Sequence, residues 1–524
     1  MYRTAERRLS RLCNSGQQSL LTGGRIGLEK ECLRVTREGN IAQTRHPPPL
    51  GSALTNPYIT TDYSEALTEL ITPPFTDIRG CLDFLRDTQT FVYANLGDEL
   101  LWSTSMPCVV AGETSIPIAG YGVSNIGTMK SVYRRGLGHR YGRVMQVIAG
   151  AHVNYSLPAA FWPVFQEHEG DRRPRSEFIS DNYMGMTRNL QRFGWLIPYL
   201  FGASPAVCKS FLHGLPSSMA EFDVNTYFEP YGTSLRMSDI GYQNTKEAAC
   251  GVKANYDNLD AYAASLARAT EKSCAAYEPI GVLVDGEYRQ LSTSLLQIEA
   301  EYYSSVRPKV VLRGNEKPSL ALRRRGIEYI ELRSLDINAF DPLGLSEEQL
   351  RFVEIFMLFC LLQDSPRIDA DEACEIDANQ GAAARRGRDP KLVLRRHGEA
   401  LSLIAWAAEI IEAMAGIAET LDAGRRAQCY RSALVTARET VKDAARTPSA
   451  RMLNEMRAAG VGFFHYAIAK SLEHKKYFDA LSLVEDRARM FEAAARQSLS
   501  EQCEIEAADD IPFAEYLRQY FAQR

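Results

Sequence analysis

Two carboxylates stand two residues apart in the stretch RIGLEKECLRVT, residues 25–36, where apolar and polar side chains alternate. This alternation predicts a β-strand, and its period of two puts Glu29 and Glu31 on one face. Like charges on a strand face are tolerated when both face solvent, or when a divalent cation between them stabilises both ionised forms. The pair alone is compatible with both arrangements, and a metal site needs further ligands from elsewhere in the chain.

Two later segments supply such groups. Asp62 and Glu69 lie in YITTDYSEALTELITPP, residues 58–74. Residues 143–157 alternate as a second strand, with one apolar face and one small, polar face that ends in His152 and Asn154. A single strand histidine is usually a hydrogen-bonded structural residue, but a strand with this polar face also suits the floor of a cavity.

A third strand is predicted over residues 326–338, where Glu331 and Arg333 share a face with Ile327 and Tyr329. An acid and an arginine side by side fit a surface ion pair, and they equally fit a metal ligand beside a phosphate clamp. Arg236 lies in a predicted loop, TYFEPYGTSLRMSDIGY, and loops held on a rigid scaffold often carry binding residues.

Together these segments yield five carboxylates and one imidazole as candidate metal ligands: Glu29, Glu31, Asp62, Glu69, His152 and Glu331. Mainly oxygen ligands suit Mg²⁺ or Mn²⁺, which usually complete their shells with water and substrate phosphates. Arg236 and Arg333 would hold phosphoryl or carboxylate oxygens. The sequence has neither a P-loop nor a dinucleotide-binding glycine motif, so a nucleotide would be bound by metals over a sheet.

Several other elements must position these groups. Apolar spacing predicts an amphipathic helix in the first twenty residues, helices over 78–96 and 127–142, and helical then apolar structure over 176–208. A strand-like run is predicted within 291–308, with Gln297, Glu299, Glu301 and Tyr303 on one face.

After about residue 345 the composition shifts to Ala, Leu, Glu and Arg, and strand patterns disappear. Helices are predicted over 346–362, 399–423, 428–445 and 472–498, and the charged, alanine-rich interval 364–390 is predicted to be a mobile connector. We therefore expect a catalytic sheet region over 1–345 and a mainly helical region over 346–524, packed together as one integrated domain.

Composition narrows the class of protein. The chain has 524 residues, 45% hydrophobic and 24% charged, with a net charge of -5, so it is an ordinary globular protein with no preference for nucleic acid or for an anionic membrane. Its eleven cysteines form no C-x-x-C pair, the amino terminus lacks an apolar signal core, and no run reaches the roughly 18 apolar residues of a membrane helix. We expect a cytoplasmic protein.

Five segments in register closely resemble the proteobacterial glutamate-cysteine ligase family: GLEKECLRV, LGSALTNPYITTDYSEALTELITP, YRRGLGHRYGRVMQVIAGAHVNYSLP, FGWLIPYLFGASPAVC and RRGIEYIELRSLDIN. The resemblance runs from about residue 25 to 356 and continues more weakly toward the end, with a poor match over 364–390. It implies an α+β fold similar to the catalytic domain of glutamine synthetase, in which a curved, mostly antiparallel sheet forms a funnel with helices outside.

The family's activity is the ATP-dependent joining of the L-glutamate γ-carboxylate to the L-cysteine amine through a γ-glutamyl phosphate. The resemblance implies that the six candidate ligands hold Mg²⁺ or Mn²⁺, that Arg333 faces ATP and the transferred phosphoryl group, and that Arg236 binds glutamate. Arg134 and Asn154 match other substrate-side positions. Five residues match positions that line the cysteine pocket: Tyr133, Leu137, Gln146, Tyr242 and Tyr303. We expect L-glutamate, L-cysteine and ATP as partners and a monomer.

Two alternatives stay open at this stage. A related ligase would use glutamate and accept a different amine, and it would diverge in the acceptor pocket. A catalytically silent homologue would keep the fold as a binding module, although the intact acid set argues against it, because buried charges are costly to keep.

Overall fold

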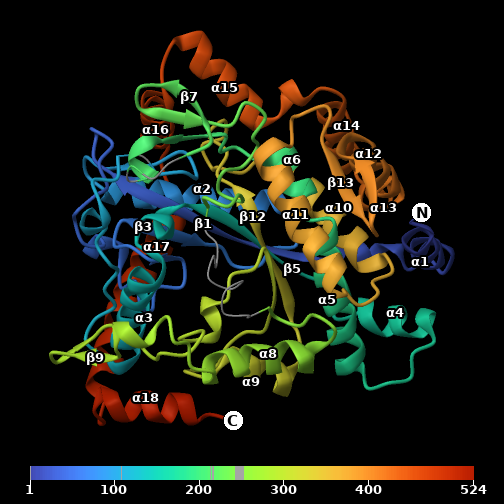
Figure 1. The fold of residues 1–524 in the computed structure, drawn as a ribbon. Helices are drawn as coiled ribbons and strands as arrows, with labels where there is room; N and C mark the ends of the chain where they lie inside the picture. The colour runs from blue at the N-terminus through green and yellow to red at the C-terminus, as the bar shows by residue number, and fades with distance from the viewer. Residues whose placement is uncertain (1, 108, 213, 215–216, 242–252) are drawn as a thin grey trace.

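An open antiparallel sheet forms the centre of the computed structural model, which describes the chain except residues 1, 108, 213, 215–216 and 242–252 (Figure 1). Its strands follow the spatial order β11-β12-β5-β1-β3-β2, and β4 pairs with β1. The bounds of these strands are Arg25–Val35 for β1, Ile59–Thr61 for β2, Leu67–Ile71 for β3, Leu100–Leu101 for β4, Gly150–Ser156 for β5, Val306–Lys309 for β11 and Tyr329–Asp336 for β12. The α+β class and the antiparallel sheet of the predicted fold are confirmed.

Helices surround this sheet (Figure 1). In the first two thirds of the chain they are α1 (Arg3–Asn14), α2 (Ile78–Asn95), α3 (Asn125–Tyr141), α4 (Phe161–Glu169), α5 (Arg175–Arg192), α6 (Leu196–Phe201), α8 (Leu259–Glu271) and α9 (Pro318–Arg325). In the last third they are α10 (Glu347–Leu362), α11 (Ala370–Arg386), α12 (Leu403–Ala413), α13 (Ala415–Asp422), α14 (Cys429–Lys442), α15 (Pro448–Ala459), α16 (Phe463–Asp479), α17 (Glu485–Ala508) and α18 (Phe513–Ala522).

Three small antiparallel sheets complete the architecture. Their strands are β6 (Ala206–Cys208), β7 (Ala220–Asp223) and β8 (Thr226–Phe228) in the first, β9 (Leu283–Val284) and β10 (Glu287–Tyr288) in the second, and β13 (Val393–Arg396) and β14 (Glu399–Ser402) in the third.

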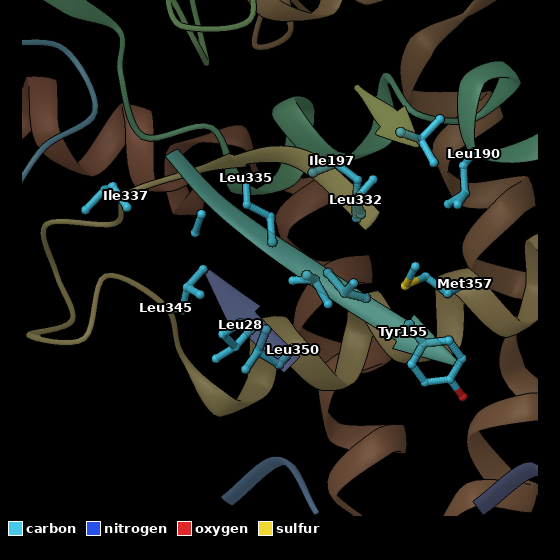
Figure 2. Packing of buried hydrophobic residues seen from close by; sticks show 14 of the residues in the cluster. Leu28, Tyr155, Leu190, Ile197, Leu332, Leu335, Ile337, Leu345, Leu350 and Met357 are labelled. Atoms are coloured by element: carbon cyan, nitrogen blue, oxygen red, sulfur yellow. The ribbon is translucent and has the colours of Figure 1, made fainter. Parts of the chain in front are cut away.

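The apolar face of the central sheet packs on α10. Figure 2 shows Leu350 and Met357 of this helix beside Leu28 of β1 and Tyr155 of β5. Every residue of α10 from Gln349 onward is buried, since the helix also contacts α5, α14 and α1. A helix that is apolar on nearly all sides belongs in a core, and here it joins the sheet to the last third of the chain.

The strand over residues 25–35 and the helices over 78–95 and 125–141 are confirmed within two residues of the predicted bounds. The third strand is also confirmed, as β12, and it carries a β-bulge between Leu332 and Leu335. A bulge adds one residue to one strand and re-aims the side chains around it, and this one lies directly beside Arg333.

The strand predicted over 143–157 is wrong in its first half. Residues Val144–Val147 form a 3-10 helix, and β5 begins only at Gly150. Val144, Gln146 and Val147 are all buried, so successive side chains do not alternate between a core and solvent, and the period of two carries no information there.

The strand-like run within 291–308 is also wrong, because only its end, β11, is a strand and Glu299–Glu301 is a 3-10 helix. Glu299 accepts hydrogen bonds from the backbone N–H and the hydroxyl of Ser319, and Glu301 pairs with Arg140 at 2.9 Å. These long-range carboxylate contacts therefore fix the segment as a 3-10 helix.

Three predictions for the last third need correction. The interval 364–390 contains α11, whose N-cap Asp369 accepts from the Glu372 N–H, and is therefore not an irregular connector. Residues 399–402 belong to the β13–β14 hairpin, which the sequence patterns missed. The helix predicted over 472–498 is two helices, α16 and α17, with a break between Asp479 and Glu485.

Candidate active site

Strand pairing brings the predicted ligands together on one face of the sheet. In the register of β1 with its neighbours, Glu29 stands opposite His152 of β5 and Glu31 opposite Glu69 of β3. On β12, Glu331 stands opposite Asn154. The paired residues are 38, 123 and 177 positions apart in sequence, and the antiparallel ladder makes them neighbours.

His152 lies at the centre of this group and is almost fully buried. Its Nδ1 atom lies 3.3 Å from Glu29 Oε2 and 3.7 Å from Glu331 Oε1, and its Nε2 atom lies 3.8 Å from Glu31 Oε1. Asn154 donates a hydrogen bond to Glu29 Oε1 at 2.8 Å. One atom each of Glu29, His152 and Glu331 lie within 4.8 Å of one another, which is the spacing of ligands around one ion.

The carboxylates repel one another strongly in this setting. Burial and the like charges of Glu29, Asp62 and Glu31 raise the pKa of Glu69 well above its usual range. Burial alone would also raise the pKa of Glu331, but the positive charges of Arg333 and Lys309 hold that pKa well below its usual range. A divalent cation would stabilise the ionised forms of the whole cluster, so hard oxygen donors around one imidazole fit Mg²⁺ or Mn²⁺.

Two arginines and one lysine border the acids. Arg333 donates to Glu331 Oε1 at 2.8 Å, and Lys309 Nζ lies 3.3 Å from Glu331 Oε2. Arg236 is almost fully buried, and it donates to the backbone carbonyl of Arg333 at 2.8 Å. Its guanidinium lies 3.9 Å from Asp336, which also accepts from the hydroxyls of Ser204 and of Ser234, a residue of the same loop as Arg236.

The loop that carries Arg236 contacts α11, the helix found within the interval 364–390. Thr233 donates through its backbone N–H to the carbonyl of Ala384 at 2.9 Å and through its hydroxyl to that of Ala383. Arg385 pairs with Glu229 and with Asp239 on either side of the loop. The carboxyl end of α11 therefore has a structural role in holding Arg236 in place.

A cavity of about 430 Å³ opens above these groups. Ten of the predicted site residues line it: Glu31, Asp62, Tyr133, Arg134, Leu137, Gln146, His152, Arg236, Tyr303 and Arg333. Glu29, Asn154 and Glu331 lie beneath this lining and contact His152 or each other, and Glu69 faces Glu31 across the ladder. Tyr242 lies outside the described residues.

Helix α3 forms one wall of the cavity through residues spaced three or four apart. Arg134 on this wall donates from Nε to the backbone carbonyl of Asp62 at 2.5 Å. Tyr303 approaches from the opposite side, where its hydroxyl lies 3.7 Å from Met237 Sδ.

Sequence patterns missed several residues that belong to this site. Arg307 and Lys309 of β11 alternate with buried Val306 and Pro308, and the register places Arg307 opposite Glu331. That alternation was a usable signal, obscured by the longer strand predicted around it. Lys130 and Tyr520 also line the cavity, and Tyr520 comes from the last helix of the chain, which no local pattern connects to the sheet.

An antiparallel sheet that gathers acids, an imidazole and arginines under one cavity suits an enzyme that handles phosphoryl groups. The sequence profile of the glutamate-cysteine ligase family matches residues 9–383. The chain therefore belongs to the glutamate-cysteine ligase family.

Individual relatives agree over the whole length. The chain is 45% identical to the glutamate-cysteine ligase of Alcanivorax borkumensis, with 98% of this chain and 99% of that protein covered. It is 46% identical to the glutamate-cysteine ligase of Azotobacter vinelandii, with 98% of each covered.

Solved structures share the fold. The glutamate-cysteine ligase of Francisella tularensis in complex with AMP superposes with a TM-score of 0.89 at 35% identity, covering 95% of this chain and 97% of that one. A bifunctional glutathione synthetase from Pasteurella multocida superposes with a TM-score of 0.73 at 23% identity, covering 93% of this chain and 58% of that one, which shows a common fold.

Proposed function

We propose that this chain joins the γ-carboxylate of L-glutamate to the amino group of L-cysteine while ATP is converted to ADP and phosphate, the first step of glutathione biosynthesis. Membership of the glutamate-cysteine ligase family supports this activity. The observation that carries the proposal is the cluster of Glu29, His152 and Glu331 beside Arg333 on the floor of the cavity. This set suits phosphoryl transfer, which needs positioning and charge neutralisation more than a protein nucleophile.

We propose six metal ligands: Glu29, Glu31, Asp62, Glu69, His152 and Glu331. Glu331 Oε2 is buried and faces Lys309 Nζ at 3.3 Å, so a bound ion would share this oxygen with that ammonium group. Bound Mg²⁺ or Mn²⁺ would neutralise phosphate oxygens of ATP. The AMP complex of the Francisella tularensis relative supports a nucleotide site in this family.

In the first step, a γ-carboxylate oxygen of glutamate attacks the terminal phosphorus of ATP, and the bond to the bridging oxygen breaks to release ADP. The carboxylate is a poor electrophile, and the resulting γ-glutamyl phosphate is a good one. Arg333 is positioned by Glu331 to hold the transferred phosphoryl group, and Arg236 is positioned by Asp336 to hold glutamate.

In the second step, the cysteine amine attacks the acyl carbon, and the tetrahedral intermediate expels phosphate as the amine loses a proton. The acceptor lies, in this proposal, against Tyr133, Leu137, Gln146, Tyr242 and Tyr303. Four of these residues line the cavity and Tyr242 lies outside the described residues. Holding the acceptor against the acyl phosphate makes the attack effectively unimolecular, which supplies much of the rate enhancement.

We also propose that the enzyme works as a cytoplasmic monomer, with residues 1–345 and 346–524 forming one integrated domain. Among the helices that the structure describes, none is long and apolar enough to cross a membrane.

The test is ADP release coupled to product mass, with ATP, Mg²⁺, glutamate and each acceptor in turn. The acceptors are cysteine, 2-aminobutyrate, other amino acids and ammonia, with an acceptor-free control. ADP release that depends on glutamate and cysteine, with a dipeptide product, is the expected result. If the enzyme preferred another amine, that amine would take the place of cysteine in the proposed reaction. Absence of ATP turnover with every acceptor would overturn the proposal.

A further inference from the structure

Lys130 on α3 is a cation in the active-site cavity that the proposed mechanism leaves without a role. It lines the cavity one helical turn before Arg134, and the two side chains share one face of the helix. Within the described part of the chain, no carboxylate lies within ion-pair distance of its ammonium group. Its one contact of note is with the ring of Tyr121, whose centroid lies 4.8 Å from Nζ.

Tyr121 is a rigid support for both cations. Its ring is 2% exposed, and its hydroxyl donates toward the backbone carbonyls of Thr61 and Asp62 at 2.7 and 2.9 Å. Arg134 lies over the same ring, at 4.5 Å from the centroid. Both cations therefore lie close to one fixed aromatic ring.

The donors of the two cations are used differently. Arg134 directs Nε to the carbonyl of Asp62 and one terminal nitrogen to the carbonyl of Lys130, so two of its five N–H donors are bound to backbone. Lys130 lines the cavity, and its ammonium group, which has three donors, makes no hydrogen bond to the residues that the structure describes. Burial and the charge of Arg134 lower the pKa of Lys130 to about 8, which indicates that its cationic form lacks full compensation and would be stabilised by an anion.

The substrates of the proposed reaction carry three kinds of anion: the ATP phosphates, the glutamate carboxylates and the acceptor's α-carboxylate. Arg333 and Arg236 account for the first two, and both lie at the sheet beside Glu331 and Asp336. Lys130 instead lies on the α3 wall with Tyr133 and Leu137, where the acceptor is proposed to bind.

We infer that Lys130 binds the α-carboxylate of the acceptor amino acid and so selects amino acids over simple amines. This inference rests on the proposed ligase activity and adds a specificity-determining residue to it. The ammonium–carboxylate contact orients the acceptor amine toward the acyl phosphate held at the sheet.

The test compares cysteine with cysteamine, which has the same thiol and amine but no carboxylate. In Lys130→Met, kcat/KM for cysteine is expected to fall by about ten- to a hundredfold, the loss of one charged hydrogen bond. The value for cysteamine is expected to change less than about twofold, since that acceptor never made the contact. KM for glutamate and for ATP should be unchanged.

Two further variants keep the test decisive. Lys130→Arg retains the charge and should retain the preference for cysteine over cysteamine. This variant provides the test if Lys130→Met does not fold. Lys209→Met is the matched control, because Lys209 also lies over a tyrosine ring, at 4.7 Å from Tyr227, but pairs with Glu221 outside the cavity. It should leave the ratio of the two acceptors unchanged.

An equal loss with both acceptors, or a raised KM for glutamate or ATP in Lys130→Met, would overturn the inference. Failure of the proposed function is distinguishable, because it would appear in the unsubstituted enzyme as a lack of cysteine-dependent ADP release before any variant is compared.

Discussion

At the scale of single residues, the strongest functional claim concerns Glu331, which is fully buried between His152, Arg333 and Lys309. Glu331→Gln should leave the fold intact and lower kcat by about a hundredfold or more at saturating Mg²⁺, because it would remove an anionic ligand from the proposed metal cluster. Steady-state kinetics with a circular dichroism check would measure this.

Glu328→Gln is the control for this change. Glu328 precedes the same strand but is exposed, and its side-chain oxygen accepts from the Val311 N–H, which an amide oxygen can also do. If both variants turned over normally, Glu331 would not be a metal ligand.

Gly150 makes room for Arg236. A Cβ atom at this position would lie 2.0 Å from an Arg236 terminal nitrogen, so Gly150→Ala should displace the guanidinium and break its bond to the carbonyl of Arg333. We expect KM for glutamate to rise by about tenfold or more, the cost of one charged hydrogen bond.

Gly381→Ala on α11 is the matched substitution, because no atom lies within 4 Å of the added methyl group. It should leave KM for glutamate unchanged. Equal behaviour of the two alanine variants would contradict the steric argument.

The buried side chain of His474 makes the free energy of unfolding depend on pH. It is buried, and its Nε2 lies 3.0 Å from the carbonyl of Ala339. Burial and the charge of Lys30 lower its pKa to about 4, against about 6.5 in an unfolded chain. The unfolded state therefore binds more protons between these values, and stability is lost as pH falls from about 6.5 toward 4.

His474→Gln keeps a donor for the carbonyl and cannot titrate. Between pH 7 and 4.5 its free energy of unfolding should fall about 2 kcal/mol less than that of the unsubstituted protein. Urea unfolding at both pH values measures the difference, and parallel losses in the two proteins would rule out His474 as a source of acid sensitivity.

At the scale of elements, the last helix, α18, packs beside α3 (Figure 1). Helix α3 forms one wall of the cavity. Leu517 and Tyr520 of α18 pack on Met129 and Val132 of α3 in a hydrophobic cluster separate from the main core. Beyond the helix, Gln523 donates to the carbonyl of Asn315 at 2.8 Å, in the loop that lines the other side of the cavity.

Gln523→Ala should therefore raise KM for at least one substrate by about three- to tenfold, since it removes two hydrogen bonds that fix this loop. Gln519→Ala is the control, because Gln519 is exposed and bonds only within α18, to Glu515. Identical KM values in the two variants would show that the loop holds its position without the tail.

The elements that the sequence predicted well are those with one apolar and one polar face. β1 and β12 have a core on one side and the cavity on the other, so a period of two is visible in their residues. Residues 144–147 and 299–301 are buried on all sides or fixed by long-range carboxylate contacts, and such tertiary contacts leave no local periodicity. For the same reason, local sequence patterns could not predict that Tyr520 lines the cavity.

At the scale of the whole molecule, one hydrophobic cluster extends from Tyr2 to Phe491 and includes both faces of α10. We expect a single cooperative unfolding transition, with no separate melting of residues 1–345 and 346–524. Leu358→Ala in α10 should cost about 2 to 5 kcal/mol and shift the transition of the entire chain.

Two tryptophans report on the two regions. Trp102 lies next to β4 of the sheet, and Trp406 lies on α12 in the last third. The chain has four tryptophans, so each reporter variant keeps Trp102 or Trp406 alone and has the other three replaced. Urea transitions of the two variants, followed by tryptophan fluorescence, should coincide with each other and with circular dichroism. Two separated midpoints would establish independent domains.

The spatial order of the strands also constrains how the enzyme folds during its synthesis. β12 is late in the sequence but inserts between β5 and β11, and it brings Glu331 and Arg333 to acids that left the ribosome about 300 residues earlier. Such distant pairings form slowly, because a long loop must close before any contact repays its entropy. A nascent chain that stops short of β12 has the early acids but lacks Glu331 and Arg333, so we expect prematurely terminated products to consume no ATP.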